Sequence, residues 1–339
     1  MAELVPSKPL ESGPLQSPLL EGRDYSSGET PYMLGIDEAG RGPVLGPMVY
    51  GCGTARVPSP RARVWRRPGR RPGRGESIGN TPLTRHPFHA VLAEHRLRQM
   101  GFMDSKVLTE EKRASLWTSM QDRTANGFLG WDIRVISAEE ISKEMLSTNR
   151  RSLNMLSFDA AIDLIRSVLD SGVNVTQVFV DTVGDSNKYQ ERLAGLFPQC
   201  KVVVCPKADS IYPIVSAASI CAKVPRDELT QNWQFLEGDA RFDRNFGSGY
   251  PGDEETKQWL SRSCDPVFGL PRFARFSWST TVNMLKERAV AVTWPDDEEG
   301  GTAQAKLGAY FSKPGEKRVG TTRHRLFKRA KLELLKELC

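Results

Sequence analysis

The chain has 339 residues, a formal net charge of +6 and a hydrophobic content of 39%, which is typical of a globular protein with a substantial core. It contains no run of about 18 apolar residues and no basic, apolar N-terminal leader, so neither a membrane span nor a secretory signal is expected. The total charge is no evidence for nucleic-acid binding, because residues 54–100 alone carry eleven arginines against two acids, or +9, and the rest carries −3.

The predicted elements begin after an N-terminal tail. Residues 1–30 are rich in Pro, Ser, Gly and Glu and are expected to be disordered. Strands are predicted at 32–38 and 44–53, on either side of a glycine turn, and the first ends in Asp37 and Glu38. Neighbouring side chains on a strand point to opposite faces, so these acids can share one ligand only where the strand ends or bulges. An acidic hairpin tip is the structural interpretation; a divalent cation beside a closely approaching phosphate backbone is the functional one.

Residues 54–100 break the pattern of the chain. Their Pro and Gly spacing forbids a continuous helix, and they show no strand alternation. Two interpretations are open: an unstructured insertion, which we favour, and a basic segment that binds RNA or directs the protein to the nucleus. The end of the segment, Ala90 to Met100, is compatible with a helix that leads into Asp104.

The remainder of the chain alternates between strands and helices. Strands are predicted at 131–137, 175–184 and 201–209, and helices at 109–123, 137–146, 152–169, 189–197, 214–235 and from 276 to about 290. The strand–helix–strand order over 175–209 suggests a βαβ unit. The acidic, glycine-containing segment 296–301 is predicted to be a linker inside a flexible C-terminal tail, 291–339.

Acidic residues stand at the ends of three predicted strands: Asp37 with Glu38, Asp181 and Asp209. In an α/β sheet the carboxyl ends of the strands gather at one edge, where ligands bind. Four carboxylates there repel one another, and hard divalent cations such as Mg²⁺ or Mn²⁺ relieve that repulsion. Two such ions about 3.5–4 Å apart catalyse in-line phosphoryl displacement. Taken singly, Asp181 and Asp209 are equally well interpreted as ordinary polar ends of strands.

Several sequence blocks together resemble type 2 ribonuclease H, the ribonuclease HII family, and above all the catalytic A subunit of its heterotrimeric eukaryotic form. The blocks are GIDEAGRGPVLGPM at 35–48, DSKVL at 104–108, FVDTVGD at 179–185, KADSIYPIVSAASICAKVPRD at 207–227, GSGYPGD at 247–253 and PVFGLPRFARFSW at 266–278. The resemblance implies an α/β fold: a ribonuclease H-like mixed sheet flanked by helices, with a helical C-terminal region. The implied catalytic domain covers 31–290 and is interrupted by the atypical insertion at about 54–100.

The resemblance also implies an activity and its metal ligands. In that family the residues at Asp37, Glu38, Asp181 and Asp209 hold two divalent ions, Mg²⁺ or Mn²⁺. The implied enzyme is an endonuclease that hydrolyses the RNA strand of RNA–DNA hybrids by a two-metal-ion mechanism. It is also expected to cut on the 5′ side of single ribonucleotides embedded in duplex DNA, leaving 3′-hydroxyl and 5′-phosphate ends. Ribonucleotide removal and Okazaki primer processing during DNA replication and repair are the roles that follow.

Recognition of the ribose is implied for a glycine loop and a tyrosine. The backbone of Gly40, Arg41 and Gly42 can approach a 2′-hydroxyl because the glycines carry no side chain. Tyr250 is implied to contact the same hydroxyl and to stack on the sugar, although a glycine-flanked tyrosine is otherwise a common turn residue. Lys106 is the best candidate for a phosphate contact. The other candidates, each equally well explained as a solvated polar group, are Asn154, Lys207, Lys223 and Arg226.

The tail and the partners are the last features that the sequence addresses. Gln304, Leu307, Tyr310 and Phe311 form Q-x-x-L-x-x-Y-F, which resembles the box that docks on the replication sliding clamp. Packing on the body or on partner subunits is the equal alternative. The family further implies two non-catalytic partner subunits, a substrate that is an RNA–DNA hybrid or a ribonucleotide-containing duplex, and no membrane. Residues 323–336 are basic and amphipathic, which suits a location in the nucleus.

Two other functions stay open. One is a catalytically impaired isoform that acts as a hybrid-binding subunit; loss of a metal-binding acid would signal it, and all four acids are present. The other is a two-metal nuclease of the same broad fold that acts on DNA. The glycine loop together with Tyr250 argues against that second alternative, because both are suited to sensing a ribose.

Overall fold

The computed structural model describes residues 13–16, 30–57, 88–122, 126–238 and 241–291. The chain divides into two compact units, Met1–Val290 and Ala291–Cys339, and all the elements below belong to the first. The predicted tail, 291–339, with its possible clamp-binding residues, lies outside the described residues apart from 291.

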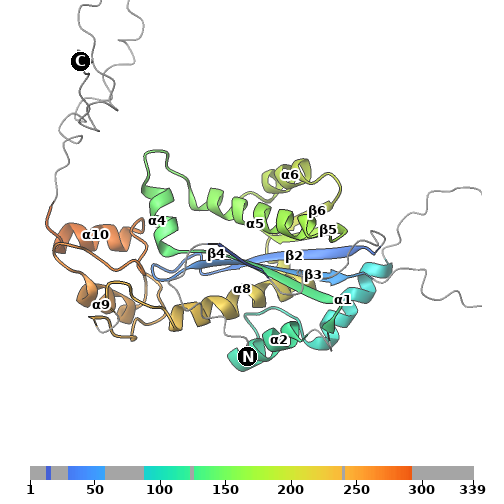
Figure 1. Ribbon diagram of the computed structural model, residues 1–339, viewed down its shortest axis with the longest axis horizontal. Helices are drawn as coiled ribbons and strands as arrows, with labels where there is room; N and C mark the ends of the chain where they lie inside the picture. Colours follow the sequence, from blue (N-terminus) through green and yellow to red (C-terminus); the bar gives the residue numbers. More distant parts are fainter. Residues whose placement is uncertain (1–12, 17–29, 58–87, 123–125, 239–240, 292–339) are drawn as a thin grey trace, which may run out of the picture. The chain divides into compact units, whose positions relative to one another are not determined.

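A mixed sheet is the centre of the described part (Figure 1). Its strands are β1 (Gly13–Gln16), β2 (Tyr32–Ala39), β3 (Met48–Arg56), β4 (Leu129–Ile136), β5 (Val175–Asp181) and β6 (Lys201–Cys205), in the spatial order β1-β4-β3-β2-β5-β6. Neighbours from β1 to β2 pair antiparallel, whereas β5 is parallel to both β2 and β6. The predicted βαβ unit is therefore confirmed, with one helix between the parallel strands β5 and β6.

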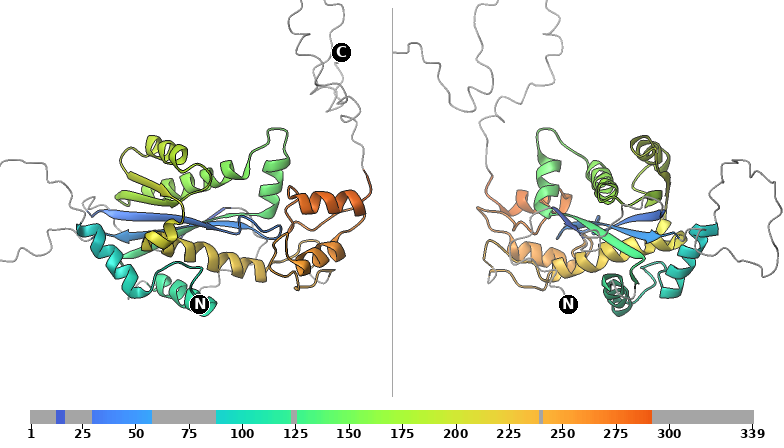
Figure 2. Two further views of the ribbon diagram at one scale, coloured as in Figure 1. Left: turned by 180° about the vertical axis from the view of Figure 1, so that it is seen from behind. Right: turned by 45° about the vertical axis from the view of Figure 1, so that its right-hand side comes forward.

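Helices cover both faces of this sheet. They are α1 (Phe88–Met100), α2 (Glu110–Gln121), α4 (Ala138–Leu146), α5 (Leu153–Asp170), α6 (Ser186–Leu196), α7 (Ala208–Ile211), α8 (Pro213–Gln231), α9 (Glu254–Ser263) and α10 (Ser279–Arg288). Figures 1 and 2 show α8 and α2 on one face and α5 and α6 on the other. Among the helices that the structure describes, none has the length and apolar character that crossing a membrane needs.

The alternation of β2 decides which side chains face which helix layer. Leu34 and Ile36 belong to the core on the α5 side, whereas Met33 packs in the core on the α8 side. Helix α8 lies very close to the sheet: a Cβ atom on Gly51 of β3 would stand 2.6 Å from the carbonyl oxygen of Ala218. Continuing the alternation places Asp37 on the α8 side and Glu38 on the α5 side.

Several helix starts follow local signals that the sequence already carries. The side chains of Thr109, Ser137 and Ser152 each accept a hydrogen bond from the backbone N–H three residues on, as N-cap residues do. The predicted helices at 109–123, 137–146 and 152–169 are thus confirmed to within about two residues as α2, α4 and α5.

The structure corrects two segment predictions. Residues 13–16, inside the tail expected to be disordered, form β1 and pair with β4. The segment 54–100, favoured as an unstructured insertion, begins inside β3 and ends in helix α1, so only 58–87 of it lies outside the described residues. Ala93 and Leu97 of α1 are buried in the core on the α8 side, which explains how apolar residues at helical spacing order the end of an otherwise patternless stretch.

Three further boundaries differ from the prediction. The second strand begins at Met48 rather than at 44, because Gly40 and Gly46 have φ values of +77° and turn the chain sharply before it. The strand predicted over 201–209 ends at Cys205, because Lys207 adopts the left-handed conformation (φ 57°) that begins α7. Helix α9 was not predicted, although its N-cap Asp253 and two following acids are a normal start signal.

A buried carboxylate on β4 gives a first testable prediction. Asp132 is fully buried, accepts hydrogen bonds from Ser167 Oγ and the Ile133 N–H, both at 2.8 Å, and has its pKa raised to about 6 by burial. Between about pH 4 and 6 the folded state keeps a proton that the unfolded state releases, so this group lowers stability as pH rises. Asp132→Asn is therefore expected to raise the free energy of unfolding at pH 8 by up to about 3 kcal/mol.

Chemical denaturation of the variant and the wild type at pH 4 and pH 8 measures this effect. The stability difference should shrink towards pH 4, where the wild-type carboxyl group is protonated in both states. A variant that is less stable than the wild type by the same amount at both pH values would show that Asp132 contributes through its charged hydrogen bonds and not through a buried, costly charge.

Candidate active site

A cleft of about 570 Å³ brings together residues from distant stretches of the chain. The predicted site residues in its lining are Asp37, Glu38, Gly40, Arg41, Gly42, Lys106, Asp181 and Tyr250. The other two predicted residues are absent from this lining and touch it from behind: Asp209 pairs with Lys106, and Asn154 accepts a hydrogen bond from Arg41. Ser105, Arg113, Lys223, Arg226 and Asp227 also line the cleft.

The two acids of β2 stand at the end of that strand, as expected, and face opposite sides of the sheet. Asp37 is 5% exposed and hydrogen-bonds Ser219 of α8. Glu38 is influenced by the side chains of Tyr50 and Tyr189, on the α5 side of the sheet. The strand ends at Ala39, one residue later, so both carboxylates reach the cleft from its two sides.

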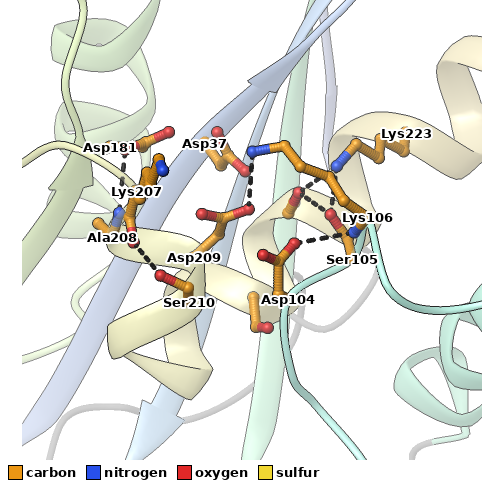
Figure 3. Close-up of polar contacts among 12 residues, drawn as sticks. Asp37, Asp104, Ser105, Lys106, Asp181, Lys207, Ala208, Asp209, Ser210 and Lys223 are labelled. Carbon is orange, nitrogen blue, oxygen red and sulfur yellow. Dashed lines mark hydrogen bonds and ion pairs between the residues drawn. The ribbon is translucent and has the colours of Figure 1, made fainter.

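Asp181 links the remaining acid to the same place. Its Oδ1 accepts hydrogen bonds from the backbone N–H of Ala208 at 3.0 Å and of Thr182 at 3.1 Å. Ala208 is the first residue of α7 and Asp209 the second, so this bond fixes the helical turn that carries Asp209. Figure 3 shows Asp37, Asp181 and Asp209 around a common space, with Lys106 reaching towards Asp209. The expectation that a strand would deliver Asp209 was wrong, since a one-turn helix does so.

Burial and mutual repulsion hold the protons on these acids. Burial, followed by the nearby charge of Asp181, raises the pKa of Asp37 to about 7, although a Ser219 hydrogen bond opposes the shift. Burial and the charges of Asp37 and Asp181 raise the pKa of Glu38 to about 8. Burial also raises the pKa of Asp181, and the charge of Asp209 adds to that effect. Such an arrangement favours whatever brings positive charge into the cleft.

The donor set fits hard divalent cations. All four groups are carboxylates, which are the ligands that Mg²⁺ and Mn²⁺ prefer. Two of their buried oxygens, Glu38 Oε2 and Asp209 Oδ1, have no hydrogen-bond partner within the described residues. No three His, Cys, Asp or Glu side chains in the described ranges already stand in a complete metal-binding arrangement. Lys106 Nζ lies 3.5 Å from Asp209 Oδ2 and supplies part of the missing positive charge.

The loop after β2, residues 40–42, is shaped by its glycines. Gly40 has a φ of +77°, and a Cβ atom there would stand 2.6 Å from the carbonyl oxygen of Pro47, so a side chain is excluded twice. A Cβ atom on Gly42 would lie 3.1 Å from Cε1 of Tyr250, whose half-exposed ring rests over the loop. The guanidinium of Arg41 donates to Ser157 Oγ at 2.6 Å and to Asn154 Oδ1. Asn154 therefore holds Arg41 in place from helix α5 and does not line the cleft.

An arginine that sequence analysis did not single out anchors this loop. Arg275 is fully buried, and its guanidinium donates to the carbonyl oxygens of Gly40, of Arg41 at 3.0 Å and of Gly46 at 3.0 Å. Trp278 Nε1 donates to the carbonyl oxygen of Gly42 at 3.1 Å. The carbonyls are held on the protein side, and the N–H groups of residues 40–42 have no acceptor within the described part of the chain. A charged residue inside the aromatic run RFARFSW is the signal that could have identified Arg275.

Two further basic residues support the acids from beneath. Lys223 of α8 donates to Ser219 Oγ at 3.0 Å and to Ser105 Oγ, and Ser219 in turn bonds Asp37. Burial lowers the pKa of Lys223. Arg113 donates to the carbonyl oxygens of Leu108 at 2.7 Å and Ser105 at 3.2 Å, which fixes the loop that carries Lys106.

Comparison with known proteins follows this geometry closely. A family model described as ribonuclease HII matches residues 73–281. The A subunit of ribonuclease H2 from Mus musculus is 43% identical over 310 residues, covering 91% of each chain, and its counterpart from Homo sapiens is 43% identical over 304 residues, covering 89% of each. The solved ribonuclease H2 from Pyrococcus horikoshii OT3 superposes with a TM-score of 0.54 and 27% identity, covering 76% of this chain and 98% of that one. The predicted α/β fold is confirmed by this likeness.

Proposed function

The chain belongs to the ribonuclease HII family and is a ribonuclease H, and on this premise we propose that it hydrolyses the RNA strand of RNA–DNA hybrids and cuts on the 5′ side of single ribonucleotides embedded in duplex DNA. The observation that carries the proposal is one cleft in which a cluster of acids adjoins a glycine loop with a tyrosine over it. The acids suit phosphodiester hydrolysis, and the loop suits recognition of a ribose.

The acids Asp37, Glu38, Asp181 and Asp209 would hold two divalent cations, Mg²⁺ or Mn²⁺. When bound there, such ions supply a water nucleophile at neutral pH and stabilise the attacking and leaving oxygens. The protein's own part is to hold the carboxylates in place: Ser219 bonds Asp37, and Asp181 fixes the turn that carries Asp209. Hydrolysis of this kind leaves 3′-hydroxyl and 5′-phosphate ends and uses no side-chain nucleophile.

Selection of RNA over DNA rests on the 2′-hydroxyl, which both donates and accepts hydrogen bonds. The unengaged N–H groups of residues 40–42 are suited to donate to it, because Arg275 and Trp278 hold the neighbouring carbonyls away. The ring of Tyr250 is half exposed above Gly42, where it can stack on the sugar and contact the same hydroxyl. Lys106, with 64% of its side chain exposed, is free to shift from Asp209 to a substrate phosphate.

The setting in the cell forms part of the proposal. Two relatives are named as one lettered component of ribonuclease H2, the A subunit, which supports an assembly with two non-catalytic subunits. We place the enzyme in the nucleus, where it would remove ribonucleotides and process Okazaki primers during DNA replication and repair. A contact with the sliding clamp through Gln304, Leu307, Tyr310 and Phe311 stays a prediction, because these residues lie outside the described part of the chain.

Cleavage of a DNA duplex that contains a single ribonucleotide tests the proposal directly. In the presence of Mg²⁺ we expect one cut, on the 5′ side of the ribonucleotide, and no cut in the matched all-DNA duplex. Cleavage of the all-DNA duplex at a comparable rate would instead identify a DNA nuclease. Binding of the hybrid without any cleavage, with Mg²⁺ or Mn²⁺, would identify a hybrid-binding subunit.

A further inference from the structure

Arg226 of helix α8 carries a guanidinium whose binding edge is unused. Its Nη1 lies 3.2 Å from Asp227 Oδ1, which fixes one end of the group. The other two nitrogens, Nε and Nη2, are buried and have no hydrogen-bond partner within the described residues. Only 12% of the side chain is exposed, so water satisfies little of this edge. Nε and Nη2 together form the side of arginine that binds a phosphate or carboxylate through two parallel hydrogen bonds.

The other cationic groups of the cleft are already engaged. Lys106 pairs with Asp209, Lys223 bonds two serines, Arg113 bonds two backbone carbonyls, and Arg41 bonds Ser157 and Asn154. A buried charged donor without a partner costs free energy that a folded protein normally avoids. The free edge of Arg226 therefore points to an anion that the described part of the chain does not supply.

The position of this edge relates the anion to the ribose. Arg226 lines the same cleft as the acids, and a Cβ atom on Gly40 would stand 2.9 Å from its Nε. The edge thus lies against the loop that we propose to recognise the 2′-hydroxyl, and Gly40 has to be a glycine partly to leave room for it. The substrate that enters this cleft is a polyanion whose phosphates adjoin each sugar.

We propose that Nε and Nη2 of Arg226 form a subsite for one backbone phosphate of the substrate duplex, adjacent to the ribose at residues 40–42. This assignment rests on the proposed function for the identity of the duplex. It singles out Arg226 among the phosphate-contact candidates that the sequence offers. The contact orients the duplex and reads no base, because phosphates are the same at every position.

Binding measured at several salt concentrations tests the subsite. The full-length protein, in the assembly in which it is purified, is titrated with a duplex containing one ribonucleotide in EDTA, where no cleavage occurs. Arg226→Gln should bind about 10- to 100-fold more weakly and should lower the slope of log K against log[salt] by about 0.9, the value for one phosphate contact. Arg226→Lys should keep the slope and lose part of the affinity, because it keeps the charge without the two-pronged edge.

The matched control is Arg262→Gln. Arg262 is an exposed arginine on α9 that pairs with Asp243 at 3.3 Å and lies outside the cleft lining, so its loss should leave affinity and salt slope unchanged. Methylphosphonate replacement of each phosphate around the ribonucleotide then locates the contact. One replacement should weaken the wild type strongly and add little to the loss in Arg226→Gln, since both remove the same interaction.

Two results would overturn the subsite. One is an unchanged salt slope in Arg226→Gln; the other is a methylphosphonate series in which every replacement adds to the loss in this variant. If Arg226→Gln does not fold, the series on the wild type and on Arg226→Lys decides the question. Salt slopes on an all-DNA duplex report the phosphate contact even if the wild type cuts no ribonucleotide, so failure of the subsite and failure of the proposed function are separate outcomes.

Discussion

Replacing Asp37 with asparagine is expected to reduce cleavage of the ribonucleotide-containing duplex by on the order of a thousandfold or more and at the same time to stabilise the metal-free protein at pH 8. The first effect follows because Asn lacks the charge that a divalent cation requires of its ligand. The second follows because Asp37 is buried, and its pKa is raised to about 7 by that burial and by Asp181. The variant keeps the shape of the side chain, so the fold should be retained.

The sign of the pH dependence is decided by the direction of the pKa shift. Because the pKa of Asp37 is higher in the folded state than in the unfolded one, the folded protein binds more protons between about pH 4 and pH 7. Stability of the metal-free wild type therefore falls as pH rises through this window, by about 1.4 kcal/mol for each unit of pKa difference. The Asn variant lacks this contribution, and added Mg²⁺ should stabilise the wild type at pH 8 more than the variant.

Denaturation in EDTA at pH 4 and pH 8, with cleavage assays in Mg²⁺, measures both effects. Asp253→Asn serves as a control of opposite sign. Asp253 accepts hydrogen bonds from Ser248 and Thr256 at the start of α9, and these bonds lower its pKa to about 2. Its contribution to stability is present above about pH 4 and is lost on acidification, so this variant should be less stable at pH 8. Full activity in Asp37→Asn would contradict the metal-binding role.

The second large effect is expected at Arg275. Replacement by methionine removes the donors that satisfy the carbonyls of Gly40, Arg41 and Gly46 and leaves these oxygens buried without partners. At about 1–3 kcal/mol for each unsatisfied group, the free energy of unfolding should fall by about 3 kcal/mol or more. The guanidinium has its pKa lowered to about 9 by burial and by Arg226, so it remains protonated at pH 7 and bonds as a cation.

Loss of this anchor should also affect selectivity, and this separates a positioning role from a purely structural one. A loop that is free to move presents its N–H groups poorly, so the preference for the ribonucleotide-containing strand over DNA should fall together with kcat. Arg275→Lys can satisfy at most part of the carbonyl set and should be intermediate in both stability and selectivity. Arg288→Gln, at the exposed end of α10, is the matched control and should change neither. Unaltered selectivity in a folded Arg275→Met protein would show that the loop is held without Arg275.

Much of the site was predictable from the sequence because its signals are local. The buried strand that ends in Asp37 and Glu38, the glycine loop that follows and the strand that ends in Asp181 all follow from apolar runs and turn residues within about ten positions. Short motifs of this kind fixed the family resemblance as well. The acids and the glycine loop were therefore available before any fold was known, and the structure brings them to one cleft.

What the sequence by itself determined is the set of chemical groups and the strands and helices that carry most of them. Only the tertiary structure decided that Asp209 sits on a one-turn helix, that Asn154 holds Arg41, that Arg275 anchors a loop more than 200 positions away, and that Arg226 keeps a free edge. The physical reason is that hydrogen bonding of a buried polar group depends on which distant groups packing brings beside it, and no local pattern encodes that neighbourhood.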